Sequence, residues 1–270
     1  MGIDPGGIDP SAQVHASAII EEGAVIGPDC KIGPFTLVGP KVRLASGVEL
    51  KSHVVITGDT TIGEDTIVFP FAVIGEIPQD LKFGGEATRL EIGARNRIRE
   101  HVTMNPGTAG GGGVTKIGDD GLFMAGCHVA HDCQIGNHVI LVNNVAVAGH
   151  CQIADQVIIG GLSGIHQFVR IGRGAIIGAL SMVTSDVVPH ALVQGPRGEL
   201  DGLNLVGLKR RGVDRADITA MRAAFLMLKQ GEGSFQERAQ RLSEEADSDY
   251  VREMVAFILG DSDRGFLTPS

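Results

Sequence analysis

The chain has 270 residues and a formal net charge of −9 at pH 7, which argues against a nucleic-acid partner because such a partner requires a basic surface. Only 4 % of the residues are aromatic, whereas the 39 glycines are about twice the usual share of roughly 7 %. This composition excludes a helical bundle for most of the chain and favours many short strands joined by tight corners.

An aliphatic residue recurs every six positions in the first part of the chain. The series is Ile8, Val14, Ile20, Ile26, Ile32, Val38, Leu44, Leu50, Ile56, Ile62, Val68 and Ile74. A helix with 3.6 residues per turn cannot keep this pattern on one face. Short strands that turn a corner every six residues can, so we predict a repetitive β-structure that begins at Ile8, after a tail of residues 1–7.

Two segments leave the repeat. Between Ile74 and Ile92 the inward positions would hold Asp80 and Glu86, and an unpaired charge in an aliphatic core is unfavourable. We therefore predict an excursion loop over residues 75–91. A second excursion is predicted over the glycine-rich residues 108–116, after which the series is shifted by one position. Excursions from a solenoid usually lie on its binding face.

The repeat resumes with twelve more aliphatic or aromatic residues and ends near Pro189. This second series is Ile117, Phe123, Val129, Ile135, Leu141, Val147, Ile153, Ile159, Ile165, Ile171, Ile177 and Val183. The segment that follows is predicted to be helical. Asp214 and the capping box that starts at Ser234 begin two helices, and a third is expected over residues 248–259. The sequence thus predicts a β-structure over residues 8–190 and a small helical domain over 191–270.

The four cysteines and the absence of long apolar runs indicate the cellular compartment in which the protein is expected. All four fall on the small inward position of the repeat, so we interpret them as core residues: Cys30, Cys127, Cys133 and Cys151. A disulfide between Cys133 and Cys151 would need an oxidising compartment. No run of 18 apolar residues and no signal-peptide pattern occur, so we expect no membrane span and a cytoplasmic location.

Three of the nine histidines are spaced by about one coil of eighteen residues. His131, His150 and His166 should therefore lie in adjacent coils near one corner and form an outward ladder of imidazoles. The histidines that occur singly at variable positions are interpreted as surface residues: His15, His53, His101, His138 and His190.

Two chemistries fit such a cluster. In the first, His131 is a general base, because its ordinary pKa suits proton abstraction at neutral pH, and Asp132 fixes its tautomer. Gly149, eighteen residues further on, can present its backbone N–H to an oxyanion. In the second, three histidines bind zinc and leave a fourth position open, as in a γ-class carbonic anhydrase.

Four motifs favour the first chemistry. QDLK at residues 79–82, HVAHDC at 128–133, GIHQF at 164–168 and GLKRR at 207–211 resemble the UDP-N-acetylglucosamine 3-O-acyltransferase family of lipid A synthesis. The resemblance extends over about residues 8–260. It implies a left-handed parallel β-helix, a homotrimer, and transfer of a 3-hydroxyacyl chain from acyl carrier protein to UDP-N-acetylglucosamine. A thioester needs no Lewis acid, so neither a cofactor nor a metal is expected.

The resemblance also implies residue roles. His131 is the base, Asp132 orients it, and the Gly149 N–H binds the oxyanion. Substrate contacts are expected from Asp80, Lys82, His128, His150, His166, Gln167, Asn204, Arg210 and Arg211. Ala179 falls on the position that measures acyl-chain length, where its methyl group is expected to shorten the groove slightly. The basic run that includes Arg210 and Arg211 suits a diphosphate and an acidic carrier protein.

Some alternatives stay open at this point. Many family members carry His-Arg where this chain has Asn105-Pro106, and Glu where it has Val206, so the sugar and uracil contacts there are undetermined. The later N-acyltransferase of the same pathway is a rival, although it carries an additional N-terminal uridine-binding domain. A non-enzymatic β-helix is another, although such modules carry outward threonine ladders. The residues leave open the acyl length and whether the product is an ester or an amide.

Overall fold

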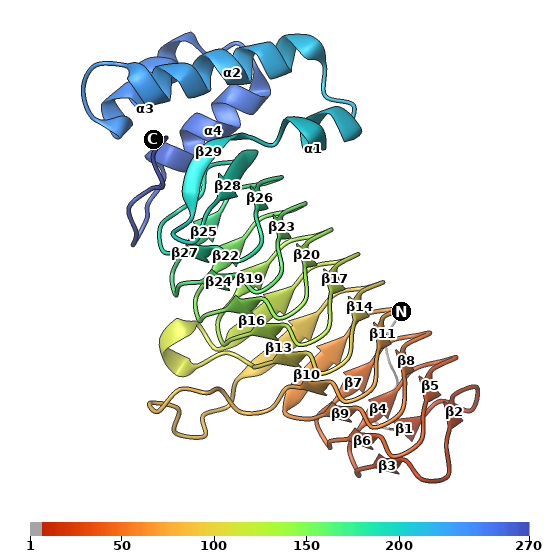
Figure 1. Ribbon diagram of the computed structural model, residues 1–270. Helices are drawn as coiled ribbons and strands as arrows, with labels where there is room; N and C mark the ends of the chain where they lie inside the picture. Colours follow the sequence, from red (N-terminus) through yellow and green to blue (C-terminus); the bar gives the residue numbers. More distant parts are fainter. Residues whose placement is uncertain (1–6, 270) are drawn as a thin grey trace.

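The computed structural model describes residues 7–269, so residues 1–6 of the predicted tail lie outside the described part. Twenty-nine strands form three sheets that wind around one axis, with four α-helices at the C-terminal end (Figure 1). Nearly all neighbouring strands within each sheet run parallel. The predicted parallel β-helix with a helical C-terminal part is confirmed.

Each coil contributes one strand to each sheet. Sheet A contains β1 (Gly7–Ile8), β4 (Val25–Ile26), β7 (Arg43–Leu44), β10 (Asp59–Ile62), β13 (Arg89–Ile92), β16 (Val114–Ile117), β19 (Gln134–Ile135), β22 (Gln152–Ile153) and β25 (Arg170–Ile171). Sheet B contains β2 (Gln13–Val14), β5 (Lys31–Ile32), β8 (Glu49–Leu50), β11 (Ile67–Val68), β14 (Arg97–Ile98), β17 (Leu122–Phe123), β20 (Ile140–Leu141), β23 (Ile158–Ile159), β26 (Ile176–Ile177), β28 (Ala191–Gln194) and β29 (Glu199–Leu203). Sheet C contains β3 (Ile19–Ile20), β6 (Leu37–Val38), β9 (Val55–Ile56), β12 (Val73–Ile74), β15 (Thr103–Met104), β18 (His128–Val129), β21 (Ala146–Val147), β24 (Gly164–Ile165) and β27 (Met182–Val183).

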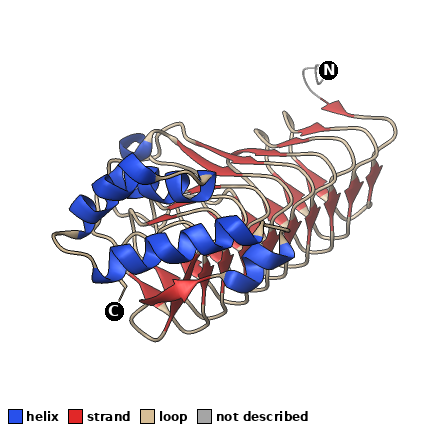
Figure 2. Ribbon diagram, turned by 90° about the horizontal axis from the view of Figure 1, so that it is seen from above, coloured by secondary structure: helices blue, strands red, loops and turns tan. Residues whose placement is uncertain are grey.

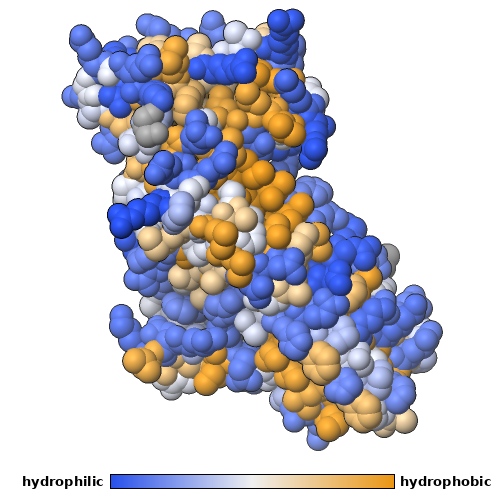
Figure 3. Space-filling model, viewed as in Figure 1, coloured by the Kyte–Doolittle hydropathy of each residue, from blue (hydrophilic) through white to orange (hydrophobic). Residues whose placement is uncertain are grey.

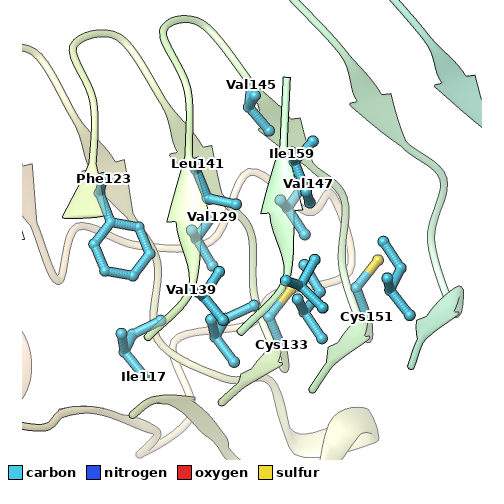
Figure 4. Packing of buried hydrophobic residues seen from close by; sticks show 14 of the residues in the cluster. Ile117, Phe123, Val129, Cys133, Val139, Leu141, Val145, Val147, Cys151 and Ile159 are labelled. Carbon is cyan, nitrogen blue, oxygen red and sulfur yellow. The ribbon is translucent and has the colours of Figure 1, made fainter. Parts of the chain in front are cut away.

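The repeated aliphatic residues fill the interior of the solenoid. Figure 4 shows how Phe123, Leu141 and Ile159 stack from coil to coil, with Cys133 and Cys151 among them. All four cysteines are buried and free, so no disulfide joins Cys133 to Cys151. The first coil departs from the pattern, because Ile8 is 49 % exposed and no other described coil covers it on its N-terminal side.

The lengths of the two excursions explain why the six-residue phase is kept after the first and shifted by one position after the second. Ile62 pairs with Ile92 in the next coil, twelve residues beyond the usual eighteen, so two whole hexads are inserted and the phase is kept. The inserted residues form the loop between β12 and β13. Ile92 pairs with Ile117, seven residues beyond the usual spacing, and this odd insertion shifts the phase by one. The second excursion contains a short 3₁₀ turn, η1 (Ala109–Gly111).

The C-terminal segment covers the last coil (Figure 2). After residue 190 the solenoid continues through β28, which pairs parallel with β26, and β29 then turns back antiparallel. The helices are α1 (Leu205–Arg210), α2 (Arg215–Gln230), α3 (Phe235–Glu245) and α4 (Asp249–Leu259). The predicted caps at Asp214 and Ser234 are present, whereas α1 was not predicted. Among residues 7–269, no helix is both long enough and apolar enough to cross a bilayer.

The prediction that His190 is a surface residue is wrong. Its side chain is fully buried between the solenoid and α4, where it lies 3.3 Å from Glu253 and 3.3 Å from Arg211. Burial lowers the pKa of His190. Burial alone would raise the pKa of Glu253, but hydrogen bonds from His190 and Arg173 lower it to about 2. This cluster, in which His190 is buried and the other members are partly exposed, joins the helical part to the β-helix.

His53 and His101 are exposed, as predicted, but they are not isolated. They alternate with two phenylalanines in one column at the corner between sheets B and C, in the order Phe35, His53, Phe71 and His101. Adjacent ring centroids are 5.0 to 5.2 Å apart. All four residues have a positive φ, which directs each side chain outward from the corner.

Candidate active site

A buried histidine–aspartate pair lies at the corner where the chain passes from sheet C to sheet A. His131 and Asp132 follow β18 after one intervening residue, Ala130, and Asp132 takes the positive φ of the corner. His131 Nδ1 lies 2.8 Å from Asp132 Oδ2, and the Asp132 side chain is fully buried. A buried carboxylate only accepts hydrogen bonds, so this contact puts the imidazole proton on Nδ1 and leaves a lone pair on Nε2. That is the tautomer a general base needs.

The second excursion holds Asp132 in place. Thr108 donates twice to the carboxylate, from its backbone N–H to Oδ1 at 2.8 Å and from its hydroxyl to Oδ2 at 2.7 Å. The backbone N–H of Asp132 donates to the Thr115 hydroxyl at 2.7 Å. Gly111 also approaches closely, because a side chain there would overlap the carboxylate. Sequence reasoning identified this excursion but missed Thr108 and Thr115, which no repeat pattern marks.

Gly149 lies directly over the His131 ring, one coil further on. A Cβ atom at this position would be 2.6 Å from Cε1 and 2.8 Å from Nε2 of His131. Among residues 7–269 the Gly149 N–H has no hydrogen-bond acceptor. The absence of a side chain therefore leaves the ring in place and keeps a free backbone donor beside Nε2.

We expect Gly149→Ala to lower kcat by about a hundredfold, because small displacements of a catalytic group have effects of that size. The three atoms nearest to the added methyl group all belong to the His131 ring and none to the backbone, so we expect the fold to be retained. Steady-state kinetics and thermal unfolding measure the two effects. Gly202→Ala is the matched control, since a Cβ there meets no atom within 4 Å. An unchanged kcat in Gly149→Ala would contradict the assigned ring position.

The predicted ladder of three histidines is only partly correct. His131 and His150 are neighbours, with ring centroids 5.0 Å apart. However, His150 occupies the same corner position as Asp132 and Phe168, and all three have a positive φ. Its ring therefore stacks on Phe168 at 4.4 Å rather than continuing to His166. Burial lowers the pKa of His150, although Asp132 opposes this.

His131, His128 and His166 share one cavity of about 500 Å³ on the outer face of sheet C. Gln167, Gly149 and, from the first excursion, Gln79 also line it. Thr103 Oγ1 lies 2.8 Å from His128 Nδ1, and burial lowers the pKa of His128. The cavity thus presents the free edge of His131 together with several hydrogen-bonding side chains.

The remaining predicted residues lie at different distances from this cavity. Asp80 and Lys82 are on the first excursion, close enough to His150 for their charges to affect its pKa. Ala179 is exposed on the turn between β26 and β27, at the corner between sheets B and C. One chain therefore does not bring Ala179 to the corner that carries His131.

The predicted nucleotide-binding residues are found at the third corner, between sheets A and B. Asn204 caps α1 by accepting a hydrogen bond from the Gly207 N–H, and it donates to the Gly174 carbonyl at 3.0 Å. Arg211 lies against His190, and Arg210 is exposed near the end of α1. Within one chain, none of these side chains faces His131.

The three-histidine zinc site considered above is not formed by these side chains. Within the described residues, the metal-ligating atoms that do come together belong to His131, Asp132 and His150, all within 4.8 Å of one another. The Asp132 oxygen of this group is already engaged by His131 and Thr108. His166 instead accepts a hydrogen bond from the Arg264 guanidinium at 2.9 Å.

Comparison with known proteins gives a consistent set of relatives. Residues 186–267 match the family described as Udp N-acetylglucosamine O-acyltransferase, Domain 2, and residues 23–58 match the bacterial transferase hexapeptide repeat. The acyl-[acyl-carrier-protein]–UDP-N-acetylglucosamine O-acyltransferase of Paracoccus denitrificans is 66 % identical over 203 residues, which cover 75 % of this chain and 77 % of that protein. The protein of the same name from Caulobacter vibrioides is 56 % identical over 207 residues, 76 % of this chain and 79 % of that protein. The solved structure of the UDP-N-acetylglucosamine acyltransferase from Campylobacter jejuni is 40 % identical, with a TM-score of 0.90 over 96 % of this chain and 100 % of that one.

Proposed function

The chain belongs to the UDP-N-acetylglucosamine O-acyltransferase family, and on that premise we propose that it transfers a 3-hydroxyacyl chain from acyl carrier protein to the 3-position of UDP-N-acetylglucosamine. This reaction is the first step of lipid A synthesis. The observation that supports it most is the His131–Asp132 pair, with the Nε2 edge of His131 lining a cavity beside the free Gly149 N–H.

The proposed reaction uses this geometry in two stages. His131 Nε2 takes the proton of the sugar 3-hydroxyl, and the oxygen attacks the thioester carbonyl. The Gly149 N–H stabilises the oxyanion of the tetrahedral intermediate. When the intermediate collapses, the new ester bond is kept, the carbon–sulfur bond breaks, and His131 returns its proton to the leaving thiol. Asp132 stabilises the imidazolium that exists between these stages.

We further propose that the working form is a homotrimer. In a single chain, Ala179, Arg211 and His131 lie at three different corners of the solenoid, so a shared site requires neighbouring copies. Apolar surface is visible at the N-terminal end of the solenoid (Figure 3). In the first coils, the side chains of Ile19 and Phe35 are 59 % and 62 % exposed. In the last coils, Leu162 and Leu180 are also exposed, at 62 % and 64 %. Surfaces of this kind are typical of subunit interfaces.

Mass spectrometry of the product tests the proposed function. The full chain is incubated with UDP-N-acetylglucosamine and a panel of 3-hydroxyacyl carrier-protein thioesters of different length. We expect one acyl chain on the sugar 3-oxygen, with a preference for chains slightly shorter than those used by relatives with glycine at the Ala179 position. A sugar nucleotide with a 3-amino group, supplied in parallel, distinguishes ester from amide formation. No acylation of either acceptor would contradict the proposal.

A further inference from the structure

The chain returns from α4 to the solenoid in a C-terminal strap, residues 260–269. Asp186 clamps this strap to the last coil. Its backbone N–H donates to the Gly265 carbonyl at 2.8 Å, and its carbonyl accepts from the Leu267 N–H at 2.9 Å. Its buried carboxylate accepts from Ser262 Oγ at 2.6 Å and from Arg170 Nε at 2.7 Å. The strap is therefore fixed by backbone and side-chain bonds to one buried residue.

This clamp places Arg264 against two residues that line the cavity. Arg264 Nη2 lies 2.9 Å from His166 Nδ1, and Arg264 Nε donates to the Gln167 carbonyl at 3.1 Å. A guanidinium has donors and no acceptor, so His166 Nδ1 must accept with its lone pair. The Gln167 carbonyl, 3.3 Å from the same nitrogen, takes its hydrogen from Arg264 instead. The ring proton of His166 is consequently on Nε2.

Two histidines on one cavity are thus held in opposite tautomers. Asp132, an acceptor, puts the proton of His131 on Nδ1 and leaves Nε2 as a base. Arg264, a donor, covers Nδ1 of His166 and leaves Nε2–H as the free edge. The Arg264 guanidinium makes both of its hydrogen bonds within the described residues to this segment, one to His166 Nδ1 and one to the Gln167 carbonyl.

We infer that Arg264 is a positioning residue that holds His166 as an Nε2–H donor toward an acceptor oxygen of the bound substrate, so that the C-terminal strap completes the active site. The inference rests on the proposed function. The oxygen is carried either by the sugar nucleotide or by the acyl chain, and the kinetic data separate the two, because the KM that rises identifies the substrate that has lost a hydrogen bond.

The tautomer is tested directly by ¹⁵N NMR of the full-length protein labelled at histidine. We expect the His166 signals, assigned by their loss in His166→Ala, to show a protonated Nε2 and an unprotonated Nδ1. In Arg264→Met the two tautomers should mix, while the His131 signals stay unchanged. Observation of the Nδ1–H tautomer in the unsubstituted protein would overturn the inference, and this result does not depend on enzymatic activity.

The kinetic arm uses a double-mutant cycle. Arg264→Met should lower kcat/KM by about tenfold, the effect of losing a hydrogen bond to a charged group, and Arg264→Lys should recover part of it. In a His166→Ala background the same change should have less than about a twofold effect, because coupled residues are non-additive. Arg222→Met, which removes an exposed arginine of α2, is the matched control and should be neutral.

Two results separate this inference from the proposed function. An equal loss from Arg264→Met in both backgrounds would show that the residue only stabilises the strap, and would overturn the positioning role while acyl transfer stands. If the unsubstituted protein transfers no acyl chain, the proposed function fails, whereas the NMR result still decides the tautomer of His166.

Discussion

His131→Ala is expected to lower kcat by about a thousandfold, within the range that general base catalysis contributes, and to leave the fold intact. The imidazole is the group whose free nitrogen faces the cavity beside the Gly149 N–H, so its removal leaves the sugar hydroxyl without a proton acceptor. The ring is 14 % exposed and lies at a corner rather than in the aliphatic core, so its loss should change stability little.

The measurement is the initial rate of acyl-sugar formation, followed by mass spectrometry, together with thermal unfolding of each protein. His15→Ala is the control, since it removes an exposed imidazole from the first coils. The general-base role is wrong if His131→Ala keeps more than a few per cent of the rate. A loss of rate accompanied by a large fall in Tm would instead indicate a folding defect.

Asp132→Asn is expected to lower kcat by about a hundredfold to ten-thousandfold, because the carboxylate selects the catalytic tautomer. Both carboxylate oxygens accept hydrogen bonds, one from the Thr108 N–H and the other from the Thr108 hydroxyl and His131. An amide must turn its NH₂ toward one of these sets of donors. Either Thr108 then loses its bond or His131 changes tautomer, and the unpaired buried donor costs about 1–3 kcal/mol of stability.

Thr108→Val provides a graded comparison for Asp132→Asn. It removes one hydroxyl donor and keeps the backbone donor and the carboxylate, so kcat should fall by roughly tenfold with little change in KM. Rates and ¹⁵N shifts of His131 are measured for both variants. If Asp132→Asn retains the rate of the unsubstituted protein, Asp132 does not orient the base. Equal losses in the two variants would assign the effect to the loop instead of the carboxylate.

Much of the fold could be predicted because the six-residue repeat determines which residues of neighbouring coils pair with each other. Each inward aliphatic pairs with its counterpart in the next coil, as Ile26 does with Leu44. The same logic brought His131, Asp132 and Gly149 together. The prediction of a histidine ladder failed because it ignored the exact position of each residue within the corner. Residues at successive positions of one corner point in different directions. His150 and His166 differ by two such positions, and this is why they do not continue one row.

Residues that depend on irregular segments could not be predicted. Thr108 lies 24 residues before Asp132 in an excursion without periodicity, and Arg264 lies 98 residues after His166, beyond all four α-helices. His190 was misjudged for a related reason. It follows the last hexad, and its partner Glu253 of α4 is 63 residues further along the chain. Such contacts depend on the path that an irregular segment takes over the solenoid, and no local sequence pattern predicts that path.

The two ends of the solenoid differ in how well their terminal coils are covered, and this difference determines which end unfolds locally first. Within residues 7–269, helices cover the last coil, whereas no element covers the first coil, in which Ile8 and Val14 are exposed. In a stack that is stabilised by nearest neighbours, an uncovered terminal unit detaches most easily, and opening then propagates one unit at a time. Amide protons should therefore exchange with solvent fastest near Ile8 and progressively more slowly toward β18. The corner that carries His131 and Asp132 would stay assembled while the first coils open.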